Sequence, residues 1–125
     1  MTADQTLPAR RCRIIVLMGS ASDRLEEAVP RIARTVSERY GGLTTSFATG
    51  HWTPDGENAS GPYDVSALMT ERVLRLDLLV MPEQKAEALD LLQEACREVN
   101  RTLALGCVHL HIECLEAEAH HRLIA

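Results

Sequence analysis

The stretch CVHLHIEC, residues 107–114, alternates apolar and polar side chains and decides the fold that we predict for this chain. Successive side chains of a β-strand point to opposite faces of a sheet. One face would carry the apolar and thiol side chains of Val108, Leu110, Ile112 and Cys114. The other face would carry Cys107, His109, His111 and Glu113. We therefore expect a strand that packs one face on a core and leaves two imidazoles and a carboxylate for an ion, a proton or another subunit.

The first half of the chain predicts a strand, a helix and a second strand. Residues 13–18 are apolar on both faces, which is typical of a central strand. Residues 19–23 form a turn with helix-capping side chains, and a helix should run from there to about Tyr40. Pro30 predicts a kink or a helix in two pieces, and Gly41-Gly42 predicts its end.

The strand that completes the first half is followed by a long loop and then by a strand, a helix and the strand quoted above. Residues 43–52 predict a strand with one side formed by Leu43, Thr45, Phe47, Thr49 and His51. Residues 53–64 are rich in Pro, Gly and Asp and predict a loop. A strand should follow within residues 65–81, and a helix that opens at Pro82 and ends at Gly106. The helix should bury a stripe formed by Ala86, Leu89, Leu92, Cys96, Val99 and Leu103.

This order of elements predicts an α+β, ferredoxin-like βαββαβ sandwich, a four-stranded antiparallel sheet with two helices on one face. Right-handed crossovers would make the first and third strands central and the last strand an edge. We expect one domain over residues 11–125, preceded by a flexible tail at residues 1–10. The type of element after residue 114 stays open.

Composition excludes several classes of function. The 125 residues carry a formal net charge of −5 and few aromatic side chains, which disfavours binding to nucleic acid. No run approaches the roughly 20 apolar residues of a membrane-spanning helix. The four cysteines lack CxxC spacing, and no apolar signal segment precedes them, so we expect reduced thiols and a cytoplasmic protein.

The sheet face opposite the helices should be a mixed apolar and polar surface. The expected register places on it Arg13, Ile15, Leu17, Thr45, Phe47, Thr49, His51, Arg75, Asp77, His109, His111 and Glu113. Such a face, beside an open edge strand, favours association with another copy. We therefore predict a homo-oligomer, a dimer or a trimer.

A divalent metal is a second possibility for this face. His109 and His111 would lie about 6–7 Å apart along one strand, close enough to share an ion. Glu113, Asp77 or His51 could complete the set of ligands.

The turn at residues 19–23 is a candidate ligand site, because its backbone N–H groups and hydroxyls suit an anion. Residues 14–23 (IIVLMGSASD) and 50–55 (GHWTPD) resemble two short motifs of the N5-carboxyaminoimidazole ribonucleotide mutase family. The resemblance implies nucleotide binding by Ser20 and Asp23 and proton transfer by His51. Trp52 stands where that family has an arginine. The predicted ligand-binding set is Ser20, Asp23, His51, Arg75 and Asp77.

The layout as a whole is similar to that of small trimeric ferredoxin-like proteins of the nitrogen-regulatory PII and CutA type. The likeness consists of the element order, the chain length and the long loop between the second and third strands. It implies ligands in clefts between subunits and a 53–64 loop that orders or moves on binding.

Our leading hypothesis is a homo-oligomeric protein of regulatory type that binds a small ligand or a protein partner and has no chemistry of its own. No complete catalytic set is fixed by spacing. One alternative is a lyase, an isomerase or a metal-assisted hydrolase that uses His51, His109 or His111. Another is a structural subunit of a larger assembly.

Overall fold

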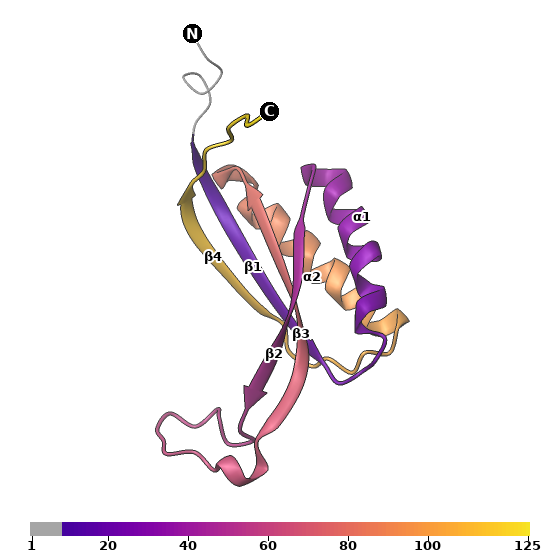
Figure 1. Ribbon diagram of the computed structural model, residues 1–125, viewed down its shortest axis with the longest axis vertical. Coiled ribbons are helices and arrows are strands. Elements are labelled where there is room, and N and C mark those ends of the chain that lie inside the picture. Colours follow the sequence, from indigo (N-terminus) through magenta and orange to yellow (C-terminus); the bar gives the residue numbers. More distant parts are fainter. Residues whose placement is uncertain (1–8) are drawn as a thin grey trace.

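A computed structural model describes residues 9–125 as a four-stranded antiparallel sheet with two helices on one face (Figure 1). The elements in chain order are β1 (Arg10–Ser20), α1 (Ala28–Tyr40), β2 (Thr44–Trp52), β3 (Met69–Val80), α2 (Lys85–Thr102) and β4 (His111–Glu118). Short 3₁₀ turns occupy Leu25–Glu27, Val65–Ala67 and Pro82–Gln84. The predicted ferredoxin-like fold is confirmed. Most of the predicted tail, residues 1–8, lies outside the described residues, and β1 already includes Arg10.

The strands lie in the order β2-β3-β1-β4, with β1 paired to both β3 and β4. β1 and β3 are therefore central, and β4 is an edge strand, as predicted. The central position of β1 follows from its sequence, because its side chains are apolar on both faces between Ile14 and Met18. No helix among the described residues is both long and apolar enough to cross a membrane.

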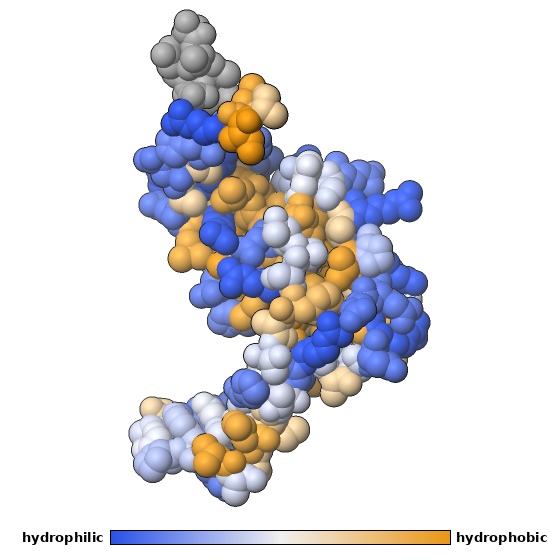
Figure 2. Space-filling model, in the orientation of Figure 1, coloured by the Kyte–Doolittle hydropathy of each residue, from blue (hydrophilic) through white to orange (hydrophobic). Residues whose placement is uncertain are grey.

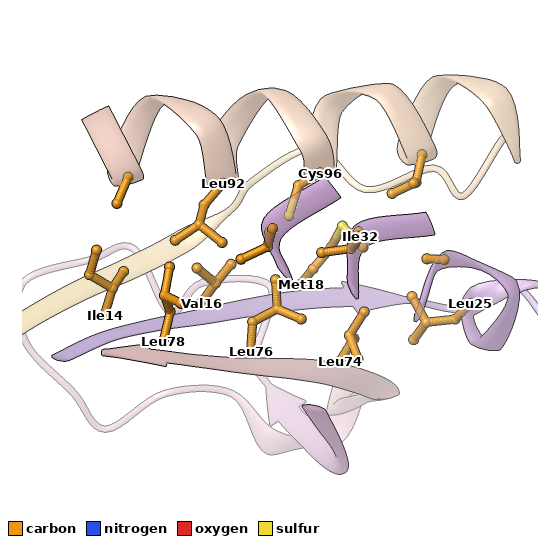
Figure 3. Packing of buried hydrophobic residues seen from close by; sticks show 14 of the residues in the cluster. Ile14, Val16, Met18, Leu25, Ile32, Leu74, Leu76, Leu78, Leu92 and Cys96 are labelled. Atoms are coloured by element: carbon orange, nitrogen blue, oxygen red, sulfur yellow. The ribbon is translucent and has the colours of Figure 1, made fainter. Parts of the chain in front are cut away.

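The core lies between the sheet and the two helices (Figure 3). Alternate residues of the central strands point into it and are fully or almost fully buried: Ile14, Val16, Met18, Leu74, Leu76 and Leu78. The helices contribute the buried side chains of Ile32, Val36, Leu92, Cys96 and Val99. The predicted stripe of α2 was wrong at its start, since Ala86 is exposed and Ala88 is buried instead.

The helix ends correct two sequence predictions. Pro30 is the third residue of α1, in the first turn, where a missing N–H breaks no intrahelical hydrogen bond. The helical segment divides instead between Glu27, the last residue of the 3₁₀ turn, and Ala28. α2 ends at Thr102 rather than at Gly106, because Ala104 and Gly106 adopt positive φ angles of 51° and 73°.

The hairpin of β2 and β3 extends beyond the helical layer as an arm (Figure 1). Residues 53–68 form the tip of this arm and contain no strand, which agrees with the loop predicted for residues 53–64. Both described chain ends lie at the opposite end of the molecule (Figure 1).

Candidate functional site: the open face of the sheet

The face of the sheet that the helices leave uncovered is defined by the strand register. Its members, which alternate with the core residues, include Arg13, Ile15, Leu17, Gly19, Thr44, Ser46, Ala48, Glu71, Val73, Arg75, Asp77, Leu79, His111, Glu113 and Leu115. Ile15 and Leu17 are half-buried, while Leu79 and Leu115 are 48% and 47% exposed. The face therefore combines exposed aliphatic side chains with charged groups.

Asp77 is the centre of the charged part of this face. Arg13 donates from Nε and Nη2 to Asp77 Oδ1 at 3.0 and 2.7 Å, and Arg75 donates from Nε to Asp77 Oδ2 at 2.9 Å. The Asp77 side chain is only 18% exposed, so both arginines act on a carboxylate that is largely shielded from water. The hydrogen bond from Arg75 and then those from Arg13 hold the pKa of Asp77 below its ordinary value.

His111 and Glu113 continue the charged face onto the edge strand. The register places Leu17 opposite His111 and Ile15 opposite Glu113, so both polar side chains lie one strand from the centre of the face. His111 Nε2 lies 3.8 Å from Glu113 Oε1. Glu113 also contributes to the raised pKa of Arg75, although the hydrogen bond to Asp77 has the larger effect. The predictions for His111, Glu113, Arg75 and Asp77 on this face agree with the structure.

His109 does not share this face, and the prediction of a strand from residue 107 was wrong. β4 begins at His111, and residues 107–110 are not in a strand. The side chain of Asn100 satisfies the backbone of Cys107 instead, donating to its carbonyl at 2.8 Å and accepting from its N–H at 2.9 Å. His109 lines a cleft of ≈ 460 Å³ beside α2, together with Met18, Cys96 and Arg97. The geometric basis for a shared ion at His109 and His111 is therefore absent.

No cluster of three or more His, Cys, Asp or Glu side chains that could hold a metal ion occurs within residues 9–125. His111 and Glu113 are a pair, and Asp77 is occupied by two arginines. The described residues thus offer no assembled set of ligands for the divalent metal that we considered at His109, His111 and Glu113.

His51 lies on the helix side of the sheet, one residue out of the register that we predicted for the second strand. Phe47 and Thr49 pair with Leu74 and Arg72, and these two β3 residues lie on the same side as the core. His51 pairs with Thr70, and its Nδ1 lies 3.0 Å from Thr70 Oγ1. Thr70 and Asp77 are seven positions apart in β3, which corresponds to roughly 23 Å along the strand. His51 therefore joins neither Asp77 nor His111.

Thr45, Phe47 and Thr49, also expected on the open face, lie on the helix side, where Phe47 contacts Arg72. The guanidinium of Arg72 lies 4.4 Å from the centre of the Phe47 ring and donates to Glu26 at 2.7 Å. Arg72 thereby joins the base of the arm to the turn before α1.

Ser20, at the end of β1, is buried and fully engaged in hydrogen bonds. Its hydroxyl donates to the carbonyl of Leu105 at 2.6 Å and accepts from the N–H of Ser22 at 3.0 Å. Asp23 is exposed in the same turn. Ser20 thus ties the turn after β1 to the segment after α2. The five residues of the predicted ligand set do not meet, because Ser20 and His51 lie on the helix side and Arg75 and Asp77 on the open face.

Replacing Ser20 by alanine should lower the free energy of unfolding by about 1–2 kcal/mol, because a buried carbonyl and a backbone N–H would lose their partner. Asp23→Ala, in the same turn but exposed, should change stability by less than about 0.5 kcal/mol. Chemical denaturation of both variants measures the difference. Equal stability of the two would contradict a structural role for Ser20.

Glu71 is a feature of the open face that sequence reasoning missed. Its carboxylate lies over Gly19, where an added Cβ would stand 2.0 Å from Glu71 Oε1. Burial raises the pKa of Glu71. The only sequence signal is Gly19 itself within a strand, which is typical of a close approach by a neighbouring group.

The tip of the arm carries exposed apolar side chains on a loop that is held by its own hydrogen bonds. Asp55 accepts from the N–H of Asp64, Asp64 accepts from Ser66, and Tyr63 donates to the carbonyl of Asn58. The exposed apolar residues at or near the tip are Trp52, Tyr63, Val65, Leu68 and Met69. Figure 2 shows hydrophobic and polar side chains mixed on this part of the surface.

Comparison with known proteins adds no family assignment: no family model matches the chain, and no curated protein matches it. The fold and the open face therefore carry the functional argument.

Proposed function

We propose that this chain is a homo-oligomer, a dimer or a trimer, that binds a small ligand or a protein partner and has no chemistry of its own. The observation that carries the proposal is one row across the open face, in which Arg13 stands between the exposed leucines Leu79 and Leu115. Exposed aliphatic side chains on an uncovered face of a sheet favour contact with a second copy of the same face. The paired charges of Asp77 would fix the register of that contact.

Two features support the binding half of the proposal. The arm presents exposed apolar side chains, including Trp52 and Leu68, on a loop that could reach a partner. The cleft beside His109 offers a volume of ≈ 460 Å³ for a small molecule. The arm suits the resemblance to proteins of the PII and CutA type, which implies that the 53–64 loop orders or moves on binding. No catalytic role is proposed for the histidines, because His51, His109 and His111 lie in three separate places.

The four cysteines are free thiols, and we propose a cytoplasmic location on this basis. Neither nucleic acid nor a membrane is proposed as a partner, since the chain has a net charge of −5.

Native mass spectrometry of the wild-type chain and of a Leu79→Glu/Leu115→Glu variant tests the oligomer. The wild type should have the mass of a dimer or a trimer. The variant should be a monomer, because two carboxylates would be buried at the contact, whereas in the monomer they face water beside Arg13. The same spectra report any small molecule that stays bound after purification.

Val108→Glu is the matched control, since Val108 is 85% exposed and lies outside the open face. This variant should keep the wild-type mass. A monomeric wild type, or a double variant with unchanged mass, would contradict the proposed oligomer.

A further inference from the structure

Two cysteines that are distant in the sequence lie side by side between β1 and the edge strand. The register pairs Ile14 with Cys114 and Cys12 with Glu116, so Cys12 and Cys114 are diagonal neighbours. Both belong to the set of alternate residues that faces away from the open face. Burial raises the pKa of the Cys12 thiol, and the neighbouring Cys114 raises it further. Cys12 is 7% exposed and Cys114 is exposed, so one sulfur lies in the protein and the other faces solvent.

The two cysteines line a small cavity of ≈ 220 Å³, and basic side chains form part of its wall. Its lining includes Arg10, Arg11, Cys12, Lys85, Cys114 and Glu116. Burial is the largest effect on the pKa of Cys12 and raises it, while the charge of Lys85, the only lysine of the chain, opposes this rise. Glu116 is held by Arg10 at 2.6 Å, so this carboxylate already has a partner.

We propose that Cys12 and Cys114 form a two-coordinate site for a soft monovalent metal ion of the copper(I) class. Thiolate sulfur is the ligand that such ions prefer. A tetrahedral zinc site would need four ligands, whereas no cluster of three or more His, Cys, Asp or Glu groups forms in the part of the chain that the structure describes.

The diagonal register favours a metal bridge over a disulfide. Diagonal neighbours in an antiparallel pair have Cα atoms roughly 7–8 Å apart, beyond the usual limit of about 6.8 Å for a disulfide. Two metal–sulfur bonds of about 2.3 Å in line would span roughly 4.6 Å between the sulfurs. The wider span suits two side chains on the same face of the sheet whose backbones are too far apart to be bridged directly.

Binding exchanges protons for the metal and transfers no electron. Each thiol gives its proton to solvent and forms one bond to the ion, so one monovalent cation and two thiolates leave a complex of net charge −1. Lys85 would compensate this charge at the wall of the cavity.

The second pair of cysteines does not offer the same chemistry. Cys96 is buried in the core, and burial raises its pKa to about 12. The thiol of Cys107 donates to the carbonyl of His109 at 3.1 Å. The pair is therefore a natural internal control.

The test is an anaerobic titration of the reduced, metal-free full chain with copper(I) against a chromophoric copper(I) chelator. The wild type should withdraw one equivalent of copper(I) per chain. Cys114→Ser should lower the affinity at least about a hundredfold, and because the residue is exposed the variant should melt like the wild type. Cys107→Ser should bind like the wild type.

A second experiment tests the charge of Lys85. Lys85→Gln should weaken binding about tenfold, and Lys85→Arg should restore it, because only the charge is needed. Mapping of thiol alkylation by mass spectrometry should show that copper(I) protects Cys114. Wild-type affinity in Cys114→Ser would overturn the proposal. A disulfide between Cys12 and Cys114 under mild oxidation without metal would contradict the geometry on which it rests.

Discussion

Replacing Leu76 by alanine should lower the free energy of unfolding by about 2–5 kcal/mol. Leu76 is completely buried in the middle of β3, beneath the helices (Figure 3). It pairs with Val16 on one side and with Thr45 on the other, so its side chain has neighbours on both flanking strands. The lost methyl groups would leave a cavity that these paired strands cannot close without moving the backbone. Urea denaturation followed by circular dichroism measures the loss.

Val108→Ala is the control for this experiment. Val108 is 85% exposed, so its replacement by alanine removes aliphatic atoms without leaving a cavity. Its effect should stay within about 0.5 kcal/mol. A Leu76→Ala variant as stable as Val108→Ala would mean that the helices do not pack on this face of the sheet.

Replacing Asp77 by asparagine should lower the free energy of unfolding by about 1.5–3 kcal/mol at pH 7. The change leaves Arg13 and Arg75 beside each other without the carboxylate that both contact. The depressed pKa of Asp77 fixes the pH dependence. The contribution of this carboxylate is complete above its unfolded pKa of about 3.9 and is lost as the pH falls through the lower pKa of the folded state.

Denaturation of wild type and Asp77→Asn between pH 7 and pH 2.5 checks this prediction. The stability difference should be constant down to about pH 5 and should narrow below about pH 4. Asp90→Asn, on the exposed surface of α2, is the control and should change the free energy of unfolding by less than about 0.5 kcal/mol at pH 7. A difference for Asp77→Asn that persists unchanged at the lowest pH would contradict the proposed role of the charge.

The fold could be predicted from sequence because its main signals are strong and local. The apolar run of β1 and the alternation of β3 leave one reasonable register, and the loop at residues 53–64 separates the hairpin strands clearly. The second strand shows the limit of this reasoning. Apart from Phe47 and Trp52, which lie on opposite faces, residues 44–52 carry small or polar side chains, so apolar alternation cannot select between two registers that differ by one residue. For this reason the prediction that His51 lies on the open face was wrong.

The prediction that His109 lies in the last strand was wrong for a different reason. Val108 and Leu110 continue the alternation of β4, but alternation does not tell whether a neighbouring strand is present to pair with. Pairing between β1 and β4 reaches only as far as Leu17 and His111. Beyond that point the backbone of Cys107 bonds to the side chain of Asn100, a contact between distant residues that no local pattern indicates.

The central position of β1 has a consequence for the order of events during synthesis. Its neighbour β4 leaves the ribosome after the other strands and helices of this sheet, and the hydrogen bond from Arg10 to Glu116 joins residues 106 positions apart. Until β4 emerges, one edge of β1 stays open, and its aliphatic side chains depend on the hairpin and helices made earlier. Such long-range closure is typical of slower folding and gives chaperones time to bind the nascent chain.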